Sequence, residues 1–366
     1  NPSGEADVTL SGRHIVRHNI LHKCGQAGIA GQRWNSYSHI HDNIIEQINY
    51  RNEFGGYETA GIKFHHATGS LIEHNFIHDV SSTEGFSGHG IWIDFKNRDI
   101  RITRNVLYRV SGISIYMEAN WGGPFSIDNN IIFGNLNKSS SSRDEVWAHN
   151  LMVDTRMEWE DQTFGDRPPV DNARWLNNVF AGQGLEAAPK RNTFVMNDNL
   201  FLAGAQPSWQ DQDSLVSQFD PIAKLSVDDS GVTLIYQWPT AKLSERKTQP
   251  AHSDHVGMPL ESMDGVQLNI LQDFFGQPFA EKQPMFGPFA DPAPGHNQVN
   301  VFSFPDNYSQ MKPANTMLGH FNIEKDLYLA NFDSKTDADD IHSVAGVATM
   351  LRDPRFAGVE FHAVAG

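Results

Sequence analysis

Two carboxylates stand at equivalent places in two short segments that follow each other along the chain. Asp94 ends the segment GIWID (residues 90–94), and Glu118 ends the segment SIYME (residues 114–118). If these segments are strands in adjacent coils of one parallel sheet, the two residues lie ~4.8 Å apart. Two carboxyl groups that close raise the pKa of one of them, which leaves an acid beside a base or nucleophile. A separation of about 5–5.5 Å suits hydrolysis of a glycosidic bond with retention, so Asp94 and Glu118 are the candidate catalytic residues.

Two further segments, GIAGQ (residues 28–32) and GIKFH (residues 61–65), align in the same register. Alternate residues of a strand point to opposite faces, so this alignment predicts two inward and two outward columns. The inward columns are Ile29, Ile62, Ile91, Ile115 and Gly31, Phe64, Ile93, Met117; the outward columns are Ala30, Lys63, Trp92, Tyr116 and Gln32, His65, Asp94, Glu118.

The residues around the carboxylate pair include groups that could bind a sugar. Trp92 and Tyr116 would offer apolar ring faces to the substrate, and the loop residues Glu58 and His89 would form one wall of a groove. The full set of candidate substrate-binding residues is Glu58, Lys63, His65, His89, Trp92, Tyr116, Trp121 and Arg167. A simpler interpretation stays open, because outward strand positions of any solenoid carry polar residues that are only solvated.

A short motif, polar-Asn-apolar-apolar, recurs at intervals of 20 to 32 residues. Stacked Asn side chains can form a hydrogen-bonded ladder between coils, and a repeat of this period indicates a solenoid. The apolar residues that follow them, such as Ile44, Phe76, Val106, Ile131, Leu151, Val179 and Leu200, are expected to stack in the core. The repeated residues are Asn19, Asn43, Asn75, Asn105, Asn130, Asn150, Asn178 and Asn199.

These repeats predict an all-β fold, a single-stranded right-handed parallel β-helix. The coils are expected over residues 1–205, and an irregular β cap or extension over residues 206–311, where the repeat fades and Pro and Gly are frequent. An open end of a solenoid exposes its core and needs such a cover. Residues 312–366 read as strand, helix and strand, which is the start of an incomplete α/β segment.

Composition narrows the classes of partner. The chain of 366 residues carries 44 acidic against 28 basic side chains, a formal charge of −16. Nucleic-acid binding needs a basic footprint, so no nucleic acid is expected, and no apolar run approaches the ~20 residues that span a bilayer. A single cysteine, Cys24, excludes an intrachain disulfide. Both ends read as cut, so the absence of a signal peptide does not bear on localisation.

The repeats of residues 19–199, with GYETAGIKFHH, GIWID, YMEANWGGPFSIDNNI and the later GPF, resemble carbohydrate-active right-handed β-helix proteins over about residues 10–310. The chain looks most like the glycoside hydrolases among them. That resemblance implies a polysaccharide or oligosaccharide substrate, catalysis by Asp94 and Glu118, no cofactor for the β-helix, and an extracellular or periplasmic location. Two alternatives stay open: a polysaccharide lyase, although Lys63 has no Arg in its column, and a non-catalytic glycan-binding or adhesion protein. The oligomeric state is not indicated.

The tail carries a resemblance of its own. The stretch LANFDSKTDADDIHSVAGV (residues 329–347) is similar to the first strand, loop and helix of nucleoside-hydrolase-like domains. By that resemblance Asp333, Asp339 and Asp340 would be ligands of Ca²⁺, a hard ion that prefers oxygen, in the complete domain. Lys335 stands where the family typically has another Asp. Helix capping by Asp337 with first-turn acids is the alternative.

Overall fold

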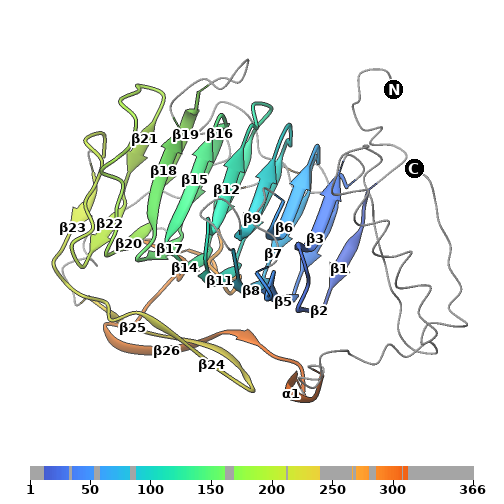
Figure 1. Ribbon diagram of the computed structural model, residues 1–366. Helices are drawn as coiled ribbons and strands as arrows, with labels where there is room; N and C mark the ends of the chain where they lie inside the picture. Colours follow the sequence, from blue (N-terminus) through green and yellow to red (C-terminus); the bar gives the residue numbers. More distant parts are fainter. Residues whose placement is uncertain are drawn as a thin grey trace, which may run out of the picture. The chain divides into compact units, whose positions relative to one another are not determined.

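The computed structural model in Figure 1 describes ten ranges of the chain. It divides the chain into two compact units, residues 1–306 and 307–366. The only element described in the second unit is the short helix α1 (Tyr308–Met311). The predicted tail strands and helix, with Asp333, Asp339 and Asp340, lie outside the described residues. Those residues are 12–32, 35–52, 58–82, 88–160, 169–211, 213–239, 266, 269–279, 286–306 and 308–311.

The first unit is a parallel β-helix in which each coil contributes strands to three parallel sheets, which we name A, B and C (Figure 1). Sheet A contains β1 (Ile15–Arg17), β4 (His39–His41), β7 (Leu71–Glu73), β10 (Ile100–Thr103), β13 (Phe125–Asp128), β16 (Arg143–Ala148), β19 (Asp171–Leu176) and β21 (Val195–Asn197). Sheet B contains β2 (Ile20–His22), β5 (Ile44–Ile48), β8 (Phe76–Val80), β11 (Val106–Val110), β14 (Ile131–Phe133), β17 (Leu151–Val153), β20 (Val179–Ala181), β22 (Leu200–Leu202) and β23 (Leu215–Val216). Sheet C contains β3 (Ala27–Gln32), β6 (Ala60–His65), β9 (His89–Asp94), β12 (Ile115–Glu118), β15 (Leu136–Ser140) and β18 (Arg156–Glu160).

The predicted Asn ladder is confirmed in the turns between sheets A and B. From Asn19 to Asn199, the Nδ2 of each repeated Asn donates to the Oδ1 of the next one at 2.9–3.1 Å. The same Oδ1 also accepts the backbone N–H of the preceding Asn, as Asn130 does for Asn105 at 3.0 Å. Buried amides are thus fully paired along the stack, which is the condition for burying them at all.

The polar residue before each ladder Asn is explained by the backbone. At all eight repeats this residue has a positive φ of 48–59°, in the left-handed region. Polar residues such as Asn, Asp and His enter that region at lower cost than β-branched residues. The eight residues are His18, Asp42, His74, Arg104, Asn129, His149, Asn177 and Asp198.

The core differs from the sequence prediction in sheet B. The residues expected to stack inside, such as Ile44, Phe76 and Val179, are buried but lie on the outer face of the sheet. The core instead receives the next residue of each strand. A one-residue change of register moves every side chain to the other face. These next residues are Ile45, Ile77, Leu107, Ile132, Met152, Phe180 and Phe201, and Ile48, Val80 and Val110 of the same sheet also belong to the core.

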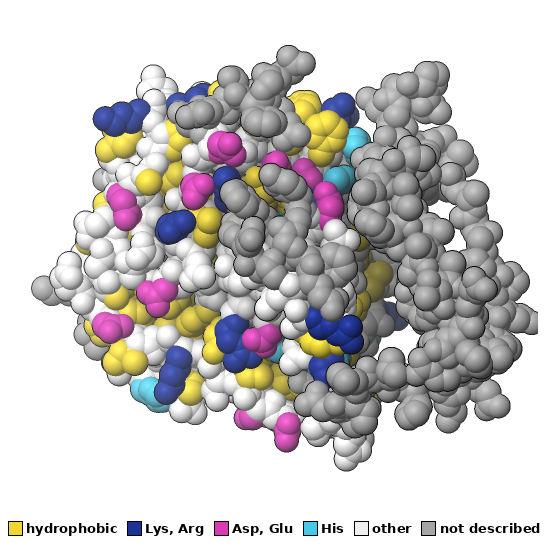
Figure 2. Space-filling model, viewed as in Figure 1, with side chains coloured by type: hydrophobic (Ala, Val, Ile, Leu, Met, Phe, Trp, Pro, Cys, Tyr) yellow, Lys and Arg dark blue, Asp and Glu magenta, His cyan; other side chains and the backbone are white. Residues whose placement is uncertain are grey.

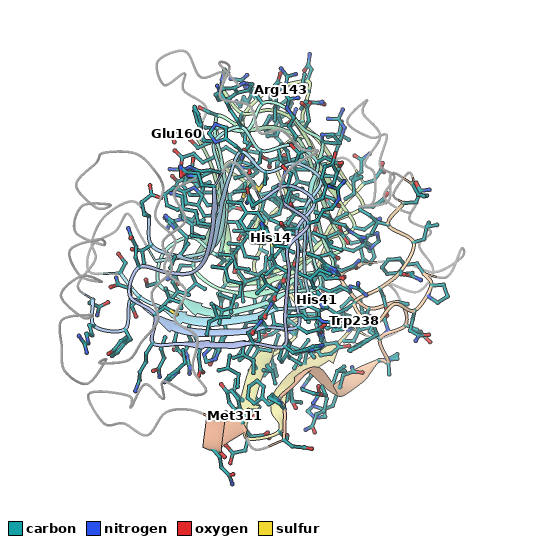
Figure 3. The ribbon with its side chains drawn as sticks, turned by 90° about the vertical axis from the view of Figure 1, so that its right-hand side faces the viewer. His14, His41, Arg143, Glu160, Trp238 and Met311 are labelled. Carbon is teal, nitrogen blue, oxygen red and sulfur yellow. The ribbon has the colours of Figure 1, made fainter. Side chains whose placement is uncertain are left out.

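The outer face of sheet B carries apolar side chains such as Ile44 and Phe76, which a cap covers. The cap contains an antiparallel sheet of β24 (Lys224–Asp228), β25 (Gly231–Trp238) and β26 (Gly295–Ser303). Its side chains meet the solenoid directly: the ring of Phe76 lies 5.9 Å from the rings of both Phe302 and Phe304. In the view along the solenoid, Trp238 of this cap and Glu160 of sheet C lie on different sides of the coils (Figure 3). The outer face of sheet C is therefore not the face that the cap covers.

A partly buried ion cluster lies on the outer face of sheet A. Glu73 accepts a hydrogen bond from His39 at 2.7 Å and pairs with Arg104. Burial alone would raise the pKa of Glu73, but the hydrogen bond from His39 and the charge of Arg104 outweigh it and lower the pKa to about 2. The stabilisation from this shift is present above the unfolded pKa, about 4.3, and is lost as pH falls toward 2.

Glu73→Gln is accordingly expected to lower the free energy of unfolding by up to about 3 kcal/mol at pH 6, the equivalent of the pKa shift. The difference from the parent protein should shrink steadily below pH 4.5. Urea unfolding curves at pH 6 and pH 3 measure it, with the exposed Glu186→Gln as control. A deficit of the same size at both pH values would contradict the electrostatic explanation.

Candidate active site on the outer face of sheet C

The structure places the candidate carboxylates in register on adjacent strands. In the pairing of β9 with β12, Asp94 lies opposite Glu118 and Trp92 lies opposite Tyr116. The outward columns continue one coil earlier, where His65 and Lys63 of β6 lie opposite Asp94 and Trp92. The predicted inward residues of these strands, Ile62, Phe64, Ile91, Ile93, Ile115 and Met117, all belong to the core.

Local backbone features position the two strands. Gly90 is the second residue of β9, and a Cβ there would lie 2.5 Å from the carbonyl oxygen of Ser114, so only glycine fits without a shift. A second, shorter Asn ladder follows the strands: Asn97 Nδ2 donates to Asn120 Oδ1 at 3.1 Å and to the carbonyl of Asp94 at 2.7 Å. Sequence reasoning missed this ladder, although Asn97 and Asn120 stand three and two residues after the carboxylates.

Asp94 is held as an anion. Its Oδ2 lies 2.7 Å from His65 Nε2 and 3.2 Å from Lys63 Nζ. Burial alone would raise the pKa of Asp94, but the hydrogen bond from His65 and the charge of Lys63 outweigh it and hold the pKa below its ordinary value. A carboxylate that stays ionised is suited to act as a nucleophile or base and unsuited to act as an acid.

Lys63 is surrounded on all sides. Its ammonium group pairs with Glu58 and Asp94 and sits 3.4 Å from the centroid of the Trp92 ring. Its side chain is only 5% exposed. This cation links the turn that carries Glu58 to the strand that carries Asp94, so both predicted residues belong to one ionic cluster. In that cluster Lys63 stabilises negative charge and has no open side toward a substrate.

The two aromatic residues differ from their predicted role. Trp92 is 2% exposed and Tyr116 is 8% exposed, because Lys63 covers one face of the indole and Tyr116 stacks on the other at 5.5 Å. The expectation that Trp92 offers an open face to a sugar is therefore wrong. The alternation pattern cannot reveal that neighbouring coils cover an outward ring. Instead, Trp92 Nε1 donates a hydrogen bond to Glu118 Oε2 at 3.2 Å.

Glu118 opens onto a cavity of about 670 Å³. Burial and the negative charge of Glu118 raise the pKa of Tyr116, which keeps its phenol neutral beside the carboxylate. Three of the described residues that line this cavity were not predicted from the sequence to face outward. They are Leu136, Lys138 and Glu158. Their coils lack the GIxxD pattern, and only the observed register with β12 and β15 reveals them.

The remaining predicted residues lie around this centre. His89 was expected in a loop that forms a wall of the groove, but it is the first residue of β9 and is buried. It packs edge-on against Trp92 at 4.7 Å and so supports the indole ring. Trp121 lies in the turn after β12, edge-on to Phe95 at 5.8 Å. Arg167 lies outside the described residues.

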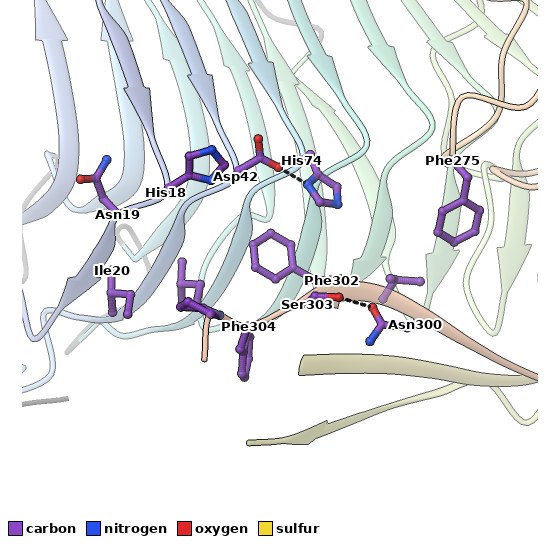
Figure 4. A pocket seen from close by; sticks show the side chains of 13 residues that line it. His18, Asn19, Ile20, Asp42, His74, Phe275, Asn300, Phe302, Ser303 and Phe304 are labelled. Carbon is purple, nitrogen blue, oxygen red and sulfur yellow. Dashed lines mark hydrogen bonds and ion pairs between the residues drawn. The ribbon is translucent and has the colours of Figure 1, made fainter. Parts of the chain in front are cut away.

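A second cavity, of about 470 Å³, lies between the coils and the cap (Figure 4). Its described lining contains one carboxylate, Asp42, which is paired with His41 and His74 at 2.5 Å each. That arrangement lacks the pair of carboxylates that glycoside hydrolysis uses. Among the described residues, no group of three or more His, Cys, Asp or Glu could hold a metal ion.

The charged surface and the described helices bear on possible partners. On the face shown in Figure 2, Lys and Arg side chains are scattered among Asp and Glu side chains and form no continuous basic field. In the part of the chain that the structure describes, no helix is long and apolar enough to cross a membrane.

Comparisons with known proteins address the fold. A family model described as "Right handed beta helix region" matches residues 3–145. No protein of curated function matches the chain. Among solved structures, the complex of XylC with xylose superposes with a TM-score of 0.66 at 23% identity, and covers 80% of this chain. The match spans 52% of XylC, about half its length. The chain is a right-handed parallel β-helix.

Two further structures show weaker likeness. The PL6 family alginate lyase AlyGC has a TM-score of 0.44 at 18% identity, covering 63% of this chain and 38% of that one. DFA-IIIase from Arthrobacter chlorophenolicus A6, solved without its lid in complex with GF2, has a TM-score of 0.22 at 16% identity, covering 52% and 56%.

Proposed function

We infer that this protein is a carbohydrate-active enzyme that hydrolyses glycosidic bonds with retention, using Asp94 as the nucleophile and Glu118 as the acid and base. One observation carries this proposal: Asp94 and Glu118 are register partners on adjacent strands, and they differ in environment. Asp94 is ionised by Lys63 and His65, whereas Glu118 opens onto a cavity. Adjacent strands lie ~4.8 Å apart, which supports the separation that retaining enzymes require.

The chemistry would proceed in two balanced steps. In the first, an Asp94 oxygen attacks the anomeric carbon while Glu118 gives its proton to the glycosidic oxygen, so the leaving group departs and a glycosyl ester forms. In the second, Glu118 takes a proton from water, whose oxygen attacks the same carbon and breaks the ester. Asp94 is then a free carboxylate again, and Glu118 is protonated for the next turnover.

Two other functions are disfavoured by the surroundings of Lys63. A lyase of this fold would use a basic side chain to remove a proton from the sugar, but Lys63 is enclosed by Glu58, Asp94 and the Trp92 ring. A non-catalytic glycan-binding protein would be expected to keep open aromatic faces, and Trp92 has both faces covered.

A panel of 4-nitrophenyl glycosides of both anomeric configurations tests the proposal, with xylosides first because XylC was solved with xylose. Polysaccharides are assayed in parallel by reducing ends and by ultraviolet absorbance. Release of nitrophenol and new reducing ends is the expected result. Ultraviolet-absorbing unsaturated products would indicate a lyase, and binding without turnover would indicate a glycan-binding protein.

The pH dependence follows from the state of Asp94. Activity should fall on the acid side as pH drops through the lowered pKa of Asp94, below its ordinary value. His65→Phe removes the hydrogen bond that lowers this pKa, so the acid limb of kcat/KM should move to higher pH. The pH–rate profile of the variant is compared with that of the exposed His14→Phe. An acid limb that stays in place would show that His65 does not tune the catalytic carboxylate.

A further inference from the structure

We propose that the cavity beside Glu118 binds the leaving group of the substrate, and that this leaving group is a neutral sugar. The proposal rests on the proposed hydrolase function and assigns the direction in which the substrate lies along the solenoid.

The direction follows from the order of the strands. Sheet C runs β3, β6, β9, β12, β15, β18, so a line from Asp94 to Glu118 points toward the later coils. The anomeric carbon must lie over the nucleophile Asp94, and the glycosidic oxygen must lie within hydrogen-bond reach of Glu118. The leaving group then continues past Glu118, away from Asp94, over β15 and β18.

The cavity lies on that side. Its described lining comes from β9, β12, β15 and β18 and from the turns that precede β12, β15 and later coils. No described residue of β3 or β6 lines it. Glu118 lines the cavity and Asp94 does not, and most of the described lining comes from the coil of β12 and later coils. On β15 and β18 the cavity touches Lys138 and Glu158, which stand in the row of Tyr116, two residues before the row of Glu118. The leaving group would therefore slant from Glu118 toward the beginnings of these strands. The described lining residues that are not charged include Ile113, Leu136, Asn135 and Gln183.

The charges of the cavity favour an uncharged occupant. Lys138 Nζ lies 3.2 Å from Glu158 and 3.6 Å from Glu160, and Arg156 lies 3.8 Å from Glu158. Both described cations of the lining therefore already face carboxylates, and the lining adds the carboxylate of Asp154, whereas Glu118 is protonated when the substrate binds. A uronate in this position would find both of these cations already paired with Glu158 or Glu160, and Asp154 as a further negative charge. Amide groups and an apolar floor instead suit a hydroxylated neutral ring.

The test compares two substrates that share the glycone and differ in the leaving group. Xylobiose fills the cavity with a sugar, whereas xylosyl fluoride releases a single atom that cannot fill it. For Lys138→Ala, the ratio of kcat/KM for xylobiose to that for xylosyl fluoride should fall at least tenfold. Lys138→Arg should recover most of the ratio. The exposed cap residue Lys224 gives a matched control, Lys224→Ala, and Gln183→Ala provides a second, exposed cavity variant with a smaller fall in the same ratio.

A second arm measures the charge preference. The glycosyl ester formed from xylosyl fluoride is offered free xylose or glucuronate as acceptor, and the acceptor hydroxyl gives its proton to Glu118 as the new bond forms. Disaccharide formation with xylose should exceed that with glucuronate at least tenfold. Equal losses on both substrates in the Lys138 and Gln183 variants, or a preference for glucuronate, would overturn the inference. If the parent protein cleaves neither substrate nor any aryl glycoside, the hydrolase proposal fails and the inference falls with it.

Discussion

Asp94→Asn is expected to reduce kcat/KM at least about 10²-fold on every substrate, whatever its leaving group. The amide cannot attack the anomeric carbon, so the first step loses its nucleophile. The fold should survive, because Lys63 keeps its partner Glu58 and its contact with the Trp92 ring. Steady-state kinetics with a nitrophenyl glycoside and with an unactivated disaccharide measures the effect, and circular dichroism verifies the fold.

Glu118→Gln should behave differently, and that difference tests the assignment of roles. Removing the acid costs most where the departing oxygen needs a proton, on the scale of about 10²–10⁴-fold for a disaccharide. With a dinitrophenyl glycoside, whose leaving group departs as an anion, the rate of the first step should fall far less in this variant. Asp94→Asn has no such dependence. The ratio of the two losses therefore separates the nucleophile from the acid.

The exposed cap residue Asp291 offers a control, Asp291→Asn, that should leave both substrates unaffected. If Asp94→Asn and Glu118→Gln both keep full turnover, these carboxylates are not the catalysts. Suppose that kcat/KM of Glu118→Gln falls equally on both substrates, while that of Asp94→Asn depends on the leaving group. The two roles are then exchanged, and the leaving group would lie over β6.

The sequence predicted the solenoid and the register of sheet C because both depend on periodicity. Eight Asn residues at a coil interval and the alternation of GIWID and SIYME repeat the same physical requirement in each coil: a paired amide in the turn, and apolar side chains inward. Repetition makes such a pattern readable from a single chain. Asp94 and Glu118 could be paired in advance for this reason.

Sheet B could not be assigned in the same way. Strands covered on both faces read as continuous apolar runs and carry no alternation. In NII (residues 43–45), either Ile44 or Ile45 could face the core, and only the position of the cap shows that Ile44 faces outward. The environment of Trp92 was hidden likewise, because its cover comes from residues 29 positions earlier and 24 positions later in the chain, Lys63 and Tyr116.

The Asn ladder is the other element whose loss should be costly, and Asn105 is its central test. Its Nδ2 donates to the carbonyls of Ile72 and Thr103 and to Asn130 Oδ1, at 3.0–3.1 Å. Its Oδ1 accepts both the backbone N–H and the Nδ2 of Asn75. Asn105→Leu would leave these buried partners unpaired, at about 1–3 kcal/mol each where they stay unsatisfied. A loss of at least about 3 kcal/mol in the free energy of unfolding is therefore expected.

Asn105→Asp separates the hydrogen bonds from the shape. The carboxylate has the size of the amide but turns an oxygen toward three acceptor oxygens, so the variant should be strongly destabilised at neutral pH. Burial raises the folded-state pKa of the new carboxyl above its unfolded value, about 3.9. Stability should therefore recover as pH falls through the folded pKa, the opposite trend to that of Glu73 in the parent protein. Urea unfolding at pH 7 and pH 5 measures this change in the free energy of unfolding. Hydrogen exchange at the Asn75 backbone amide reports any local opening of the ladder. The exposed Asn52→Asp serves as the control. A variant as stable as the parent protein at pH 7 would mean that the ladder contributes shape alone.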